Sequence, residues 1–124
     1  MFKRIDHVEI IPRDLDQSMK FFTEILGFKF KERMTVNKPP LKEVAFLTLG
    51  DTMLELLSYE NPAPPAACQV GYCAMAVEVD SMDEAIKYLK TKGIAVTWGP
   101  LKMGKSIRAE IKDPNGLTIE LRQW

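Results

Sequence analysis

Two segments of the chain share one order of hydrophobic and polar positions. Each begins with an apolar strand-like run, passes through a polar break into an amphipathic helical pattern, and reaches a glycine where that pattern stops. Apolar residues at helical spacing predict one helix over 15–26 and a second over 82–92. Gly27 and Gly93 follow these segments and suit the left-handed conformation that often ends a helix. The pattern therefore indicates an internal repeat.

The predicted helix starts repeat as well. Asp14 and Gln17 have the spacing of a capping box, in which side chains satisfy the free amide groups of the first helical turn. Ser81 and Glu84 have the same spacing in the second half. Each helix is therefore expected to begin directly after its cap, at the same point of the repeat.

After each predicted helix, the sequence changes to strand-like segments separated by turn residues. These strands are expected at about 28–35, 42–49 and 52–58, and again at about 94–98, 106–112 and 117–122. Gly99-Pro100 is interpreted as a turn, and Asn115-Gly116 as a tight turn between two strands. The segment 61–67 contains three prolines and reads as a semi-rigid linker.

These elements predict a single α+β domain over residues 1–124, built from two tandem βαβββ modules that form a half-open curved sheet. The modules are expected at about 1–60 and 70–124, with the proline-rich linker 61–67 between them. The alternative is an ordinary α+β sandwich without internal symmetry. Recurrence of caps, apolar stripes, stops and hairpins in one order favours the repeat.

Composition and charge exclude several classes of protein. The chain has 17 basic and 17 acidic residues, so its formal net charge is zero and it lacks the basic excess typical of nucleic-acid binding. No apolar run approaches the roughly 20 residues needed to cross a bilayer, and the first residues do not resemble a secretory signal. The two cysteines indicate no disulfide framework. We therefore expect no membrane or nucleic-acid partner and a cytoplasmic location.

Three polar residues stand inside strongly apolar strands: His7, Glu55 and Glu120. For each residue alone, an exposed strand face or a satisfied hydrogen bond is the commoner explanation. Both glutamates, however, lie in the last strand of their module, four positions after a turn residue. If the first and last strands face one cleft, an imidazole and two carboxylates would converge there, a reasonable ligand set for a divalent metal.

The residues also resemble a known family, the vicinal oxygen chelate superfamily, which contains glyoxalase I, bleomycin resistance proteins and dioxygenases. The similarity covers nearly the whole chain and is most specific at the end. Its motifs are Ile5-Asp6-His7-Val8, Thr52-Met53-Leu54-Glu55-Leu56 and Asp113-Pro114-Asn115-Gly116-Leu117-Thr118-Ile119-Glu120-Leu121. The run from Val44 to Leu57 is similar to the methylmalonyl-CoA epimerase branch. The resemblance implies the glyoxalase/bleomycin resistance fold, a small-molecule substrate and a homodimer.

Members of this family with a full site hold a divalent metal with two side chains from each module. Carried over by position, the resemblance assigns His7, Glu55 and Glu120 as metal ligands. The fourth ligand is normally a histidine, and this chain has Ala74 there and no second histidine. The expected ion is Ni, Co, Mn, Zn or Mg, and its binding is expected to be weak because of Ala74.

The activity implied is that of a glyoxalase-like lyase or isomerase, which moves a proton next to a carbonyl with the help of a metal. It would be similar to lactoylglutathione lyase or to an acyl-CoA epimerase. Glu120 is the first choice for the catalytic base and Glu55 the second. Substrate-binding candidates are Arg108, Tyr72, Phe46 and Trp98.

The alternative is a non-catalytic small-molecule binding or resistance protein of the same fold with a degenerate metal site. A binding protein would be expected to purify without stoichiometric metal, whereas an isomerase would need it. An extradiol dioxygenase ranks last, because that chemistry usually uses two histidines and the chain has one.

Overall fold

The structure is a computed structural model that describes residues 1, 4–63 and 73–124. The chain divides into two compact units, Met1–Pro64 and Pro65–Trp124. This boundary falls inside the segment predicted as the linker, of which residues 64–67 lie outside the described residues. Whether the two units make one domain stays a prediction.

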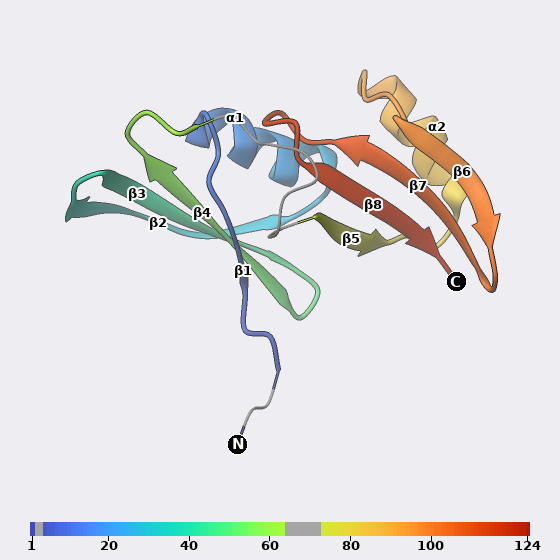
Figure 1. Cartoon of the computed structure of the whole chain (residues 1–124), viewed down its shortest axis with the longest axis horizontal. Coiled ribbons are helices and arrows are strands. Elements are labelled where there is room, and N and C mark those ends of the chain that lie inside the picture. Colours follow the sequence, from blue (N-terminus) through green and yellow to red (C-terminus); the bar gives the residue numbers. More distant parts are fainter. Residues whose placement is uncertain (2–3, 64–72) are drawn as a thin grey trace. The chain divides into compact units, whose positions relative to one another are not determined.

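The first unit contains a four-stranded sheet in the order β1-β4-β3-β2 (Figure 1). β1 pairs with β4 in parallel, and the two other pairings are antiparallel. The helical segment between β1 and β2 starts as an α-helix and continues as a turn of π-helix. The bounds are β1 Val8–Ile10, α1 Leu15–Lys20, η1 Phe21–Ile25, β2 Lys29–Lys38, β3 Leu41–Leu49 and β4 Thr52–Tyr59.

The second unit has the same topology. Its sheet has the order β5-β8-β7-β6, again with one parallel pair, β5 with β8, and two antiparallel pairs. The bounds are β5 Ala74–Glu78, α2 Met82–Thr91, β6 Trp98–Met103, β7 Ser106–Lys112 and β8 Thr118–Gln123. Two mixed sheets with the same strand order and no closed barrel confirm the predicted α+β fold of two βαβββ modules.

The predicted caps form as expected. The Asp14 carboxylate accepts a hydrogen bond from the backbone N–H of Gln17 at 2.9 Å, and the Ser81 hydroxyl accepts one from Glu84 at 3.3 Å. Gly27 follows the first helical segment with a φ of +78°, a conformation that side chains with a Cβ rarely adopt. Residues that satisfy free amides and a left-handed glycine therefore fix the helix ends, as the sequence predicted.

One predicted strand is misplaced. Residues 94–98 were expected to form a strand that ends at a Gly99-Pro100 turn, but β6 runs from Trp98 to Met103 and contains both residues. The pairing of β6 with β7 is irregular between Trp98 and Leu101, so the glycine and proline occupy a bulge. Proline is tolerated there because β6 is an edge strand, where a missing N–H costs no sheet hydrogen bond.

Each helix covers one face of the sheet in its own unit. α1 contacts β4, and α2 contacts β7 and β8. In the first unit, Phe22 is fully buried and its ring lies 5.3 Å from those of Phe21 and Phe28 in edge-to-face geometry. The fully buried strand residues include Leu47, Leu54 and Leu56 in the first unit and Ile111, Ile119 and Leu121 in the second. No helix in the described part of the chain has the length and apolarity to span a bilayer.

The bulge in β6 gives a testable prediction. At Gly99, an added Cβ would lie 2.6 Å from the carbonyl oxygen of Arg108, and φ is +78°; at Gly104, φ is +63° and nothing lies within 4 Å. Gly104→Ala should therefore cost about 1 kcal/mol, for the left-handed conformation alone. Gly99→Ala should cost at least about 1 kcal/mol more, because backbone must move as well. Urea unfolding of both variants measures the difference, and equal losses would contradict the predicted clash.

Candidate functional site

The alternation of β4 decides which of its side chains face the helix. Leu54 and Leu56 are at most 1% exposed, and β4, the strand that carries them, contacts α1. Glu55 lies between them, so its side chain projects from the opposite face of the sheet. This is why an acidic residue fits into an otherwise apolar strand: the helix packs on the leucines, and the carboxylate lies on the face away from α1.

Strand pairing places two further polar residues beside Glu55. Glu9 of β1 is the direct partner of Glu55 in the parallel β1–β4 ladder. Directly paired residues on neighbouring strands project from the same face of a sheet. His7 precedes Glu9 by two positions, so it projects from that face as well. One imidazole and two carboxylates therefore meet on one face of the first unit.

The imidazole of His7 contacts three carboxylates. Its Nδ1 lies 2.9 Å from Oδ2 of Asp6. Its Nε2 lies 3.3 Å from Oε1 of Glu9 and 3.3 Å from Oε2 of Glu55. The two ring nitrogens thus have separate partners, with Asp6 at one and the glutamates at the other. We call His7, Glu9 and Glu55 the histidine cluster.

The carboxylates and the imidazole change each other's affinity for protons. Hydrogen bonds to Asp6 and then to Glu9 raise the pKa of His7 above its ordinary 6.5, and Glu55 adds to the effect. The hydrogen bond from His7 lowers the pKa of Asp6. The pKa of Glu55 is raised, first by partial burial and then by the negative charge of Glu9, while His7 acts in the opposite direction. Two acidic groups this close favour a proton or another cation between them.

The donor set of the histidine cluster fits a divalent metal. One ligand atom from each of the three residues can be chosen so that all lie within 4.8 Å of one another. Imidazole nitrogen suits Zn, Ni and Co, and carboxylate oxygen suits Mn and Mg, so the set fits a borderline or hard dication. We find no second group of three histidine, cysteine or acidic residues with ligand atoms this close together among residues 1, 4–63 and 73–124.

Glu120, the third predicted ligand, lies in the second unit, and its surroundings differ from those of Glu55. Both Nε and Nη2 of Arg122 lie 2.7 Å from Oε1 of Glu120, which makes a two-point ion pair. Ala76 is the direct partner of Glu120, in the place that Glu9 has beside Glu55. In the second module, an arginine therefore balances the carboxylate instead of a histidine. The convergence of Glu120 with His7 and Glu55 stays a prediction.

The predicted substrate-binding residues lie on both units. Phe46 is the direct β3 partner of Glu55, so the two side chains project from the same face of the sheet. Arg108 is half-buried, and its Nε donates a hydrogen bond to the Ser106 hydroxyl at 3.0 Å. Trp98 is exposed on β6. Tyr72 lies outside the described residues. Substrate contact by any of these residues stays a prediction.

Asp6 and Glu9 were missed as candidate functional residues, although the signal for them was present. Glu9 follows His7 by two positions, so strict alternation along the first strand would have placed it on the same face. The parallel pairing that puts Glu9 directly beside Glu55 is a tertiary feature that no local pattern encodes. Asp6 contacts the ring through its immediate neighbour in the chain, so adjacency to the single histidine was its signal.

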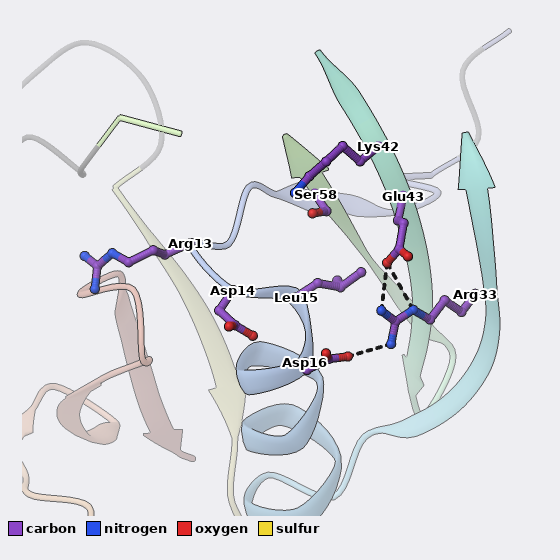
Figure 2. A pocket seen from close by; sticks show the side chains of 8 residues that line it. All are labelled: Arg13, Asp14, Leu15, Asp16, Arg33, Lys42, Glu43 and Ser58. Carbon is purple, nitrogen blue, oxygen red and sulfur yellow. Dashed lines mark hydrogen bonds and ion pairs between the residues drawn. The ribbon is translucent and has the colours of Figure 1, made fainter. Parts of the chain in front are cut away.

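A polar pocket of about 270 Å³ lies elsewhere in the first unit, beside α1, β2 and β3 (Figure 2). Arg33 spans it, with a nitrogen 2.6 Å from Asp16 and another 2.7 Å from Glu43. These hydrogen bonds, with Asp16 first, raise the pKa of Arg33. The arginine is already paired with two carboxylates, and it connects the start of α1 to the sheet. None of the residues predicted for the site lines this pocket.

Comparison with known proteins places the chain in a superfamily. The family model of the Glyoxalase/Bleomycin resistance protein/Dioxygenase superfamily matches residues 4–121, and the chain belongs to this superfamily. A lactoylglutathione lyase of Escherichia coli O157:H7 is 32% identical over 124 residues, which cover 95% of this chain and 90% of that enzyme. A human mitochondrial methylmalonyl-CoA epimerase is 30% identical over 130 residues, covering 97% of this chain and 73% of the epimerase.

The chain is shorter than some of its relatives. Lactoylglutathione lyase GLX1 of Arabidopsis thaliana is 29% identical over 126 residues, which cover 98% of this chain but 44% of the plant enzyme. The chain thus spans less than half of that relative. The resemblance stated from the motifs is confirmed at the level of the superfamily and of its glyoxalase-like and epimerase relatives.

Solved structures share the fold. A glyoxalase family protein from Enterococcus faecalis superposes with a TM-score of 0.85 at 27% identity, covering 98% of each chain. TnmS3, an antibiotic binding protein from Streptomyces sp. CB03234, has a TM-score of 0.80 at 21% identity, covering 98% of this chain and 96% of its own. The fold alone therefore does not separate an enzyme from a binding protein.

The cluster predicts how His7 titrates in metal-free protein. As the single histidine of the chain, it gives one unambiguous set of ring signals in NMR. Its pKa should lie above 6.5, and Asp6→Asn should lower it, since Asp6 is the largest cause of the shift. A raised folded-state pKa stabilises the fold most below pH 6.5, and this contribution disappears as the pH rises through the raised value.

The control for this titration is Asp83→Asn, which makes the same change at an exposed position on α2. It should leave the His7 titration unchanged. A wild-type midpoint at or below 6.5, or an identical midpoint in Asp6→Asn, would show that the contacts around the ring do not hold in solution.

Proposed function

We propose that this chain is a glyoxalase-like enzyme that moves a proton next to a carbonyl group with the help of a divalent metal. The observation that carries the proposal is the histidine cluster, in which an imidazole and two carboxylates meet on the face of the sheet that points away from α1. Membership of the superfamily and relatives that include lactoylglutathione lyases and an epimerase support the same class of chemistry.

In this proposal, His7 and Glu55 hold the metal. A divalent cation at this position would supply Lewis-acid stabilisation of the negative charge that develops on a substrate carbonyl. Asp6 orients the ring, because its carboxylate accepts from Nδ1 and leaves Nε2 directed at the glutamates. Phe46, the direct β3 partner of Glu55, projects from the same face of the sheet.

We propose Glu120 as the base, in keeping with its place in the repeat. One carboxylate oxygen takes the proton from the carbon next to the carbonyl, and the electron pair of the broken C–H bond moves onto the carbonyl oxygen to give an enediolate. In an isomerisation, the protonated Glu120 then returns the proton to the neighbouring carbon. In an epimerisation, the same carbon takes a proton from water on its opposite face, and Glu120 gives its own proton to the hydroxide that remains. Arg122 holds Oε1 at two points and so fixes the orientation of the carboxylate.

We also propose that the substrate is a small molecule with an anionic end and that the protein is a cytoplasmic homodimer. Arg108 is the candidate for the anionic end, since it is half-buried and its hydrogen bond to the Ser106 hydroxyl uses Nε rather than the two terminal nitrogens. Trp98 and Phe46 are candidates for contact with the apolar part of the substrate.

Exposed apolar residues on the edge strand β6, among them Leu101 and Met103, support an interface between two copies. A monomer by light scattering at micromolar concentration would contradict the dimer.

A second function has its own supporting observation. Ala74 leaves the family's fourth ligand missing, and Arg122 already balances the charge of Glu120. Both features are compatible with a non-catalytic small-molecule binding or resistance protein that keeps the fold. Such a protein would bind its ligand equally well after chelation and would tolerate Glu55→Gln combined with Glu120→Gln. The enzyme requires both metal and carboxylates.

The proposed function is tested by assay after chelation and reloading. The chelated protein is supplied with Ni, Co, Mn or Zn and assayed with methylglyoxal–thiol adducts and with acyl-CoA epimers. At least one combination should give turnover. Glu120→Gln should lower kcat/KM by about 100-fold or more, because the amide cannot accept the proton.

Glu84→Gln is the matched control for that variant, since Glu84 is an exposed carboxylate of the same unit on α2. Its kcat/KM should equal that of the wild type. If no substrate turns over with any of the four metals, or if Glu120→Gln keeps full activity, the proposed reaction is wrong.

A further inference from the structure

The two modules differ in the residues that surround their equivalent glutamates. In the first module, the strand next to Glu55 carries His7 and Glu9. In the second, the strand next to Glu120 carries Ala74 and Ala76 at the matching positions of the same parallel ladder. Three potential metal ligands thus lie together in the first module. A metal site shared equally between the two modules would need only two ligands from each.

The charge partners differ in the same way. Glu120 has Arg122 two residues further along β8, whereas the position two residues after Glu55 is Leu57. The charge of Glu120 is therefore balanced within its own strand. Glu9 and Glu55 lie directly beside each other, and neither forms an ion pair with an arginine among the described residues. Their positive partner is the ring of His7, at 3.3 Å from each.

The orientation of the ring is the third observation. A histidine that binds a metal usually donates its other ring N–H to a carboxylate, which fixes the tautomer and the direction of the free nitrogen. Asp6 accepts from Nδ1 at 2.9 Å, while Nε2 is directed at Glu9 and Glu55. This is the arrangement of a carboxylate–histidine–metal unit, with a second pair of carboxylates at the position that the ion would occupy.

We infer that Glu9 is a metal ligand and that it substitutes for the ligand lost at Ala74, so that His7, Glu9 and Glu55 hold a divalent cation within the first module. One nitrogen and two carboxylates leave open positions for water and for two substrate oxygens on an octahedral ion such as Mn²⁺. Glu120, paired with Arg122, is thereby relieved of metal binding and kept for proton transfer. The inference rests on the proposed function for the role of the metal, but metal binding itself is measured separately.

The inference is tested with untagged, chelated protein and with Mn²⁺ alone as the probe. Paramagnetic Mn²⁺ should broaden the ring signals of His7, the single histidine, at less than one equivalent. Calorimetry should give one ion per chain. Glu9→Gln should weaken Mn²⁺ binding at least about tenfold, the lower end of the losses seen when even an outer partner of a ligand is removed.

Two variants separate this inference from a site of the usual family type. Glu120→Gln should leave Mn²⁺ affinity unchanged, whereas a ligand at Glu120 would make it fall. Glu32→Gln, an exposed carboxylate on β2 of the same unit, is the matched control and should also have no effect. Equal affinity in Glu9→Gln and wild type, or a loss in Glu120→Gln as large as in Glu9→Gln, would overturn the inference.

The remaining outcomes are also decisive. Thermal unfolding checks that each variant folds, and the rise in Tm on adding Mn²⁺ reports binding independently. If Glu9→Gln does not fold, Glu9→Asp, which keeps the charge and shortens the side chain, should bind more weakly than the wild type. No broadening of His7 in the wild type overturns the inference without any variant. Mn²⁺ binding that depends on Glu9, in a protein without turnover, supports the inference and contradicts the proposed function alone.

Discussion

The site depends on two carboxylates held side by side by strand pairing. Glu9 and Glu55 are direct partners in a parallel ladder, so the pairing of β1 with β4 holds their Cα atoms next to each other and on the same face of the sheet. Like charges at such a position are unfavourable unless a cation lies between them. Among the described residues, their positive partner is His7, and the ion pair is strongest when the ring is protonated. A divalent metal would satisfy the same requirement with the ring neutral, because metal and proton compete for Nε2.

The internal repeat supplies the scaffold, and its two copies have diverged in charge. Both modules keep the strand order, the capped helix and a glutamate beside the parallel first strand. The first module surrounds its glutamate with acidic groups and a histidine. The second has alanines and an arginine. The same fold thus holds a cluster that attracts a cation in the first module and an ion pair between Glu120 and Arg122 in the second. In the proposed mechanism, this division gives metal binding to the first module and proton transfer to the glutamate of the second.

Much of this fold could be predicted from local signals. The capping residues Asp14 and Ser81 and the βαβββ succession of elements in each module came out as expected, because caps and alternation act over a few residues. β6 was misplaced because Gly99 and Pro100 usually mark a turn. Here, they sit in a bulge of an edge strand, and the choice is made by pairing with β7. That information is tertiary, so the local pattern did not contain it.

The candidate site shows the same limit. His7 and Glu55 were found because polar residues in apolar strands are conspicuous in a sequence. Glu9 was passed over because one more charge near the start of an N-terminal strand is usually solvated. Its significance comes from its partner across the β1–β4 ladder, 46 positions later in the chain. The two-point contact of Arg122 with Glu120 is likewise a matter of side-chain geometry, which the local pattern does not contain.

A crystal of the full chain soaked with Mn²⁺ tests the central claim most directly. The account predicts one anomalous peak within bonding distance of Nε2 of His7 and of a carboxylate oxygen from each of Glu9 and Glu55, with Nδ1 of the ring still donating to Asp6. A peak bound to Glu120 but not to Glu9 would contradict it. So would a crystal without a peak in which Nε2 remains hydrogen-bonded to the two glutamates.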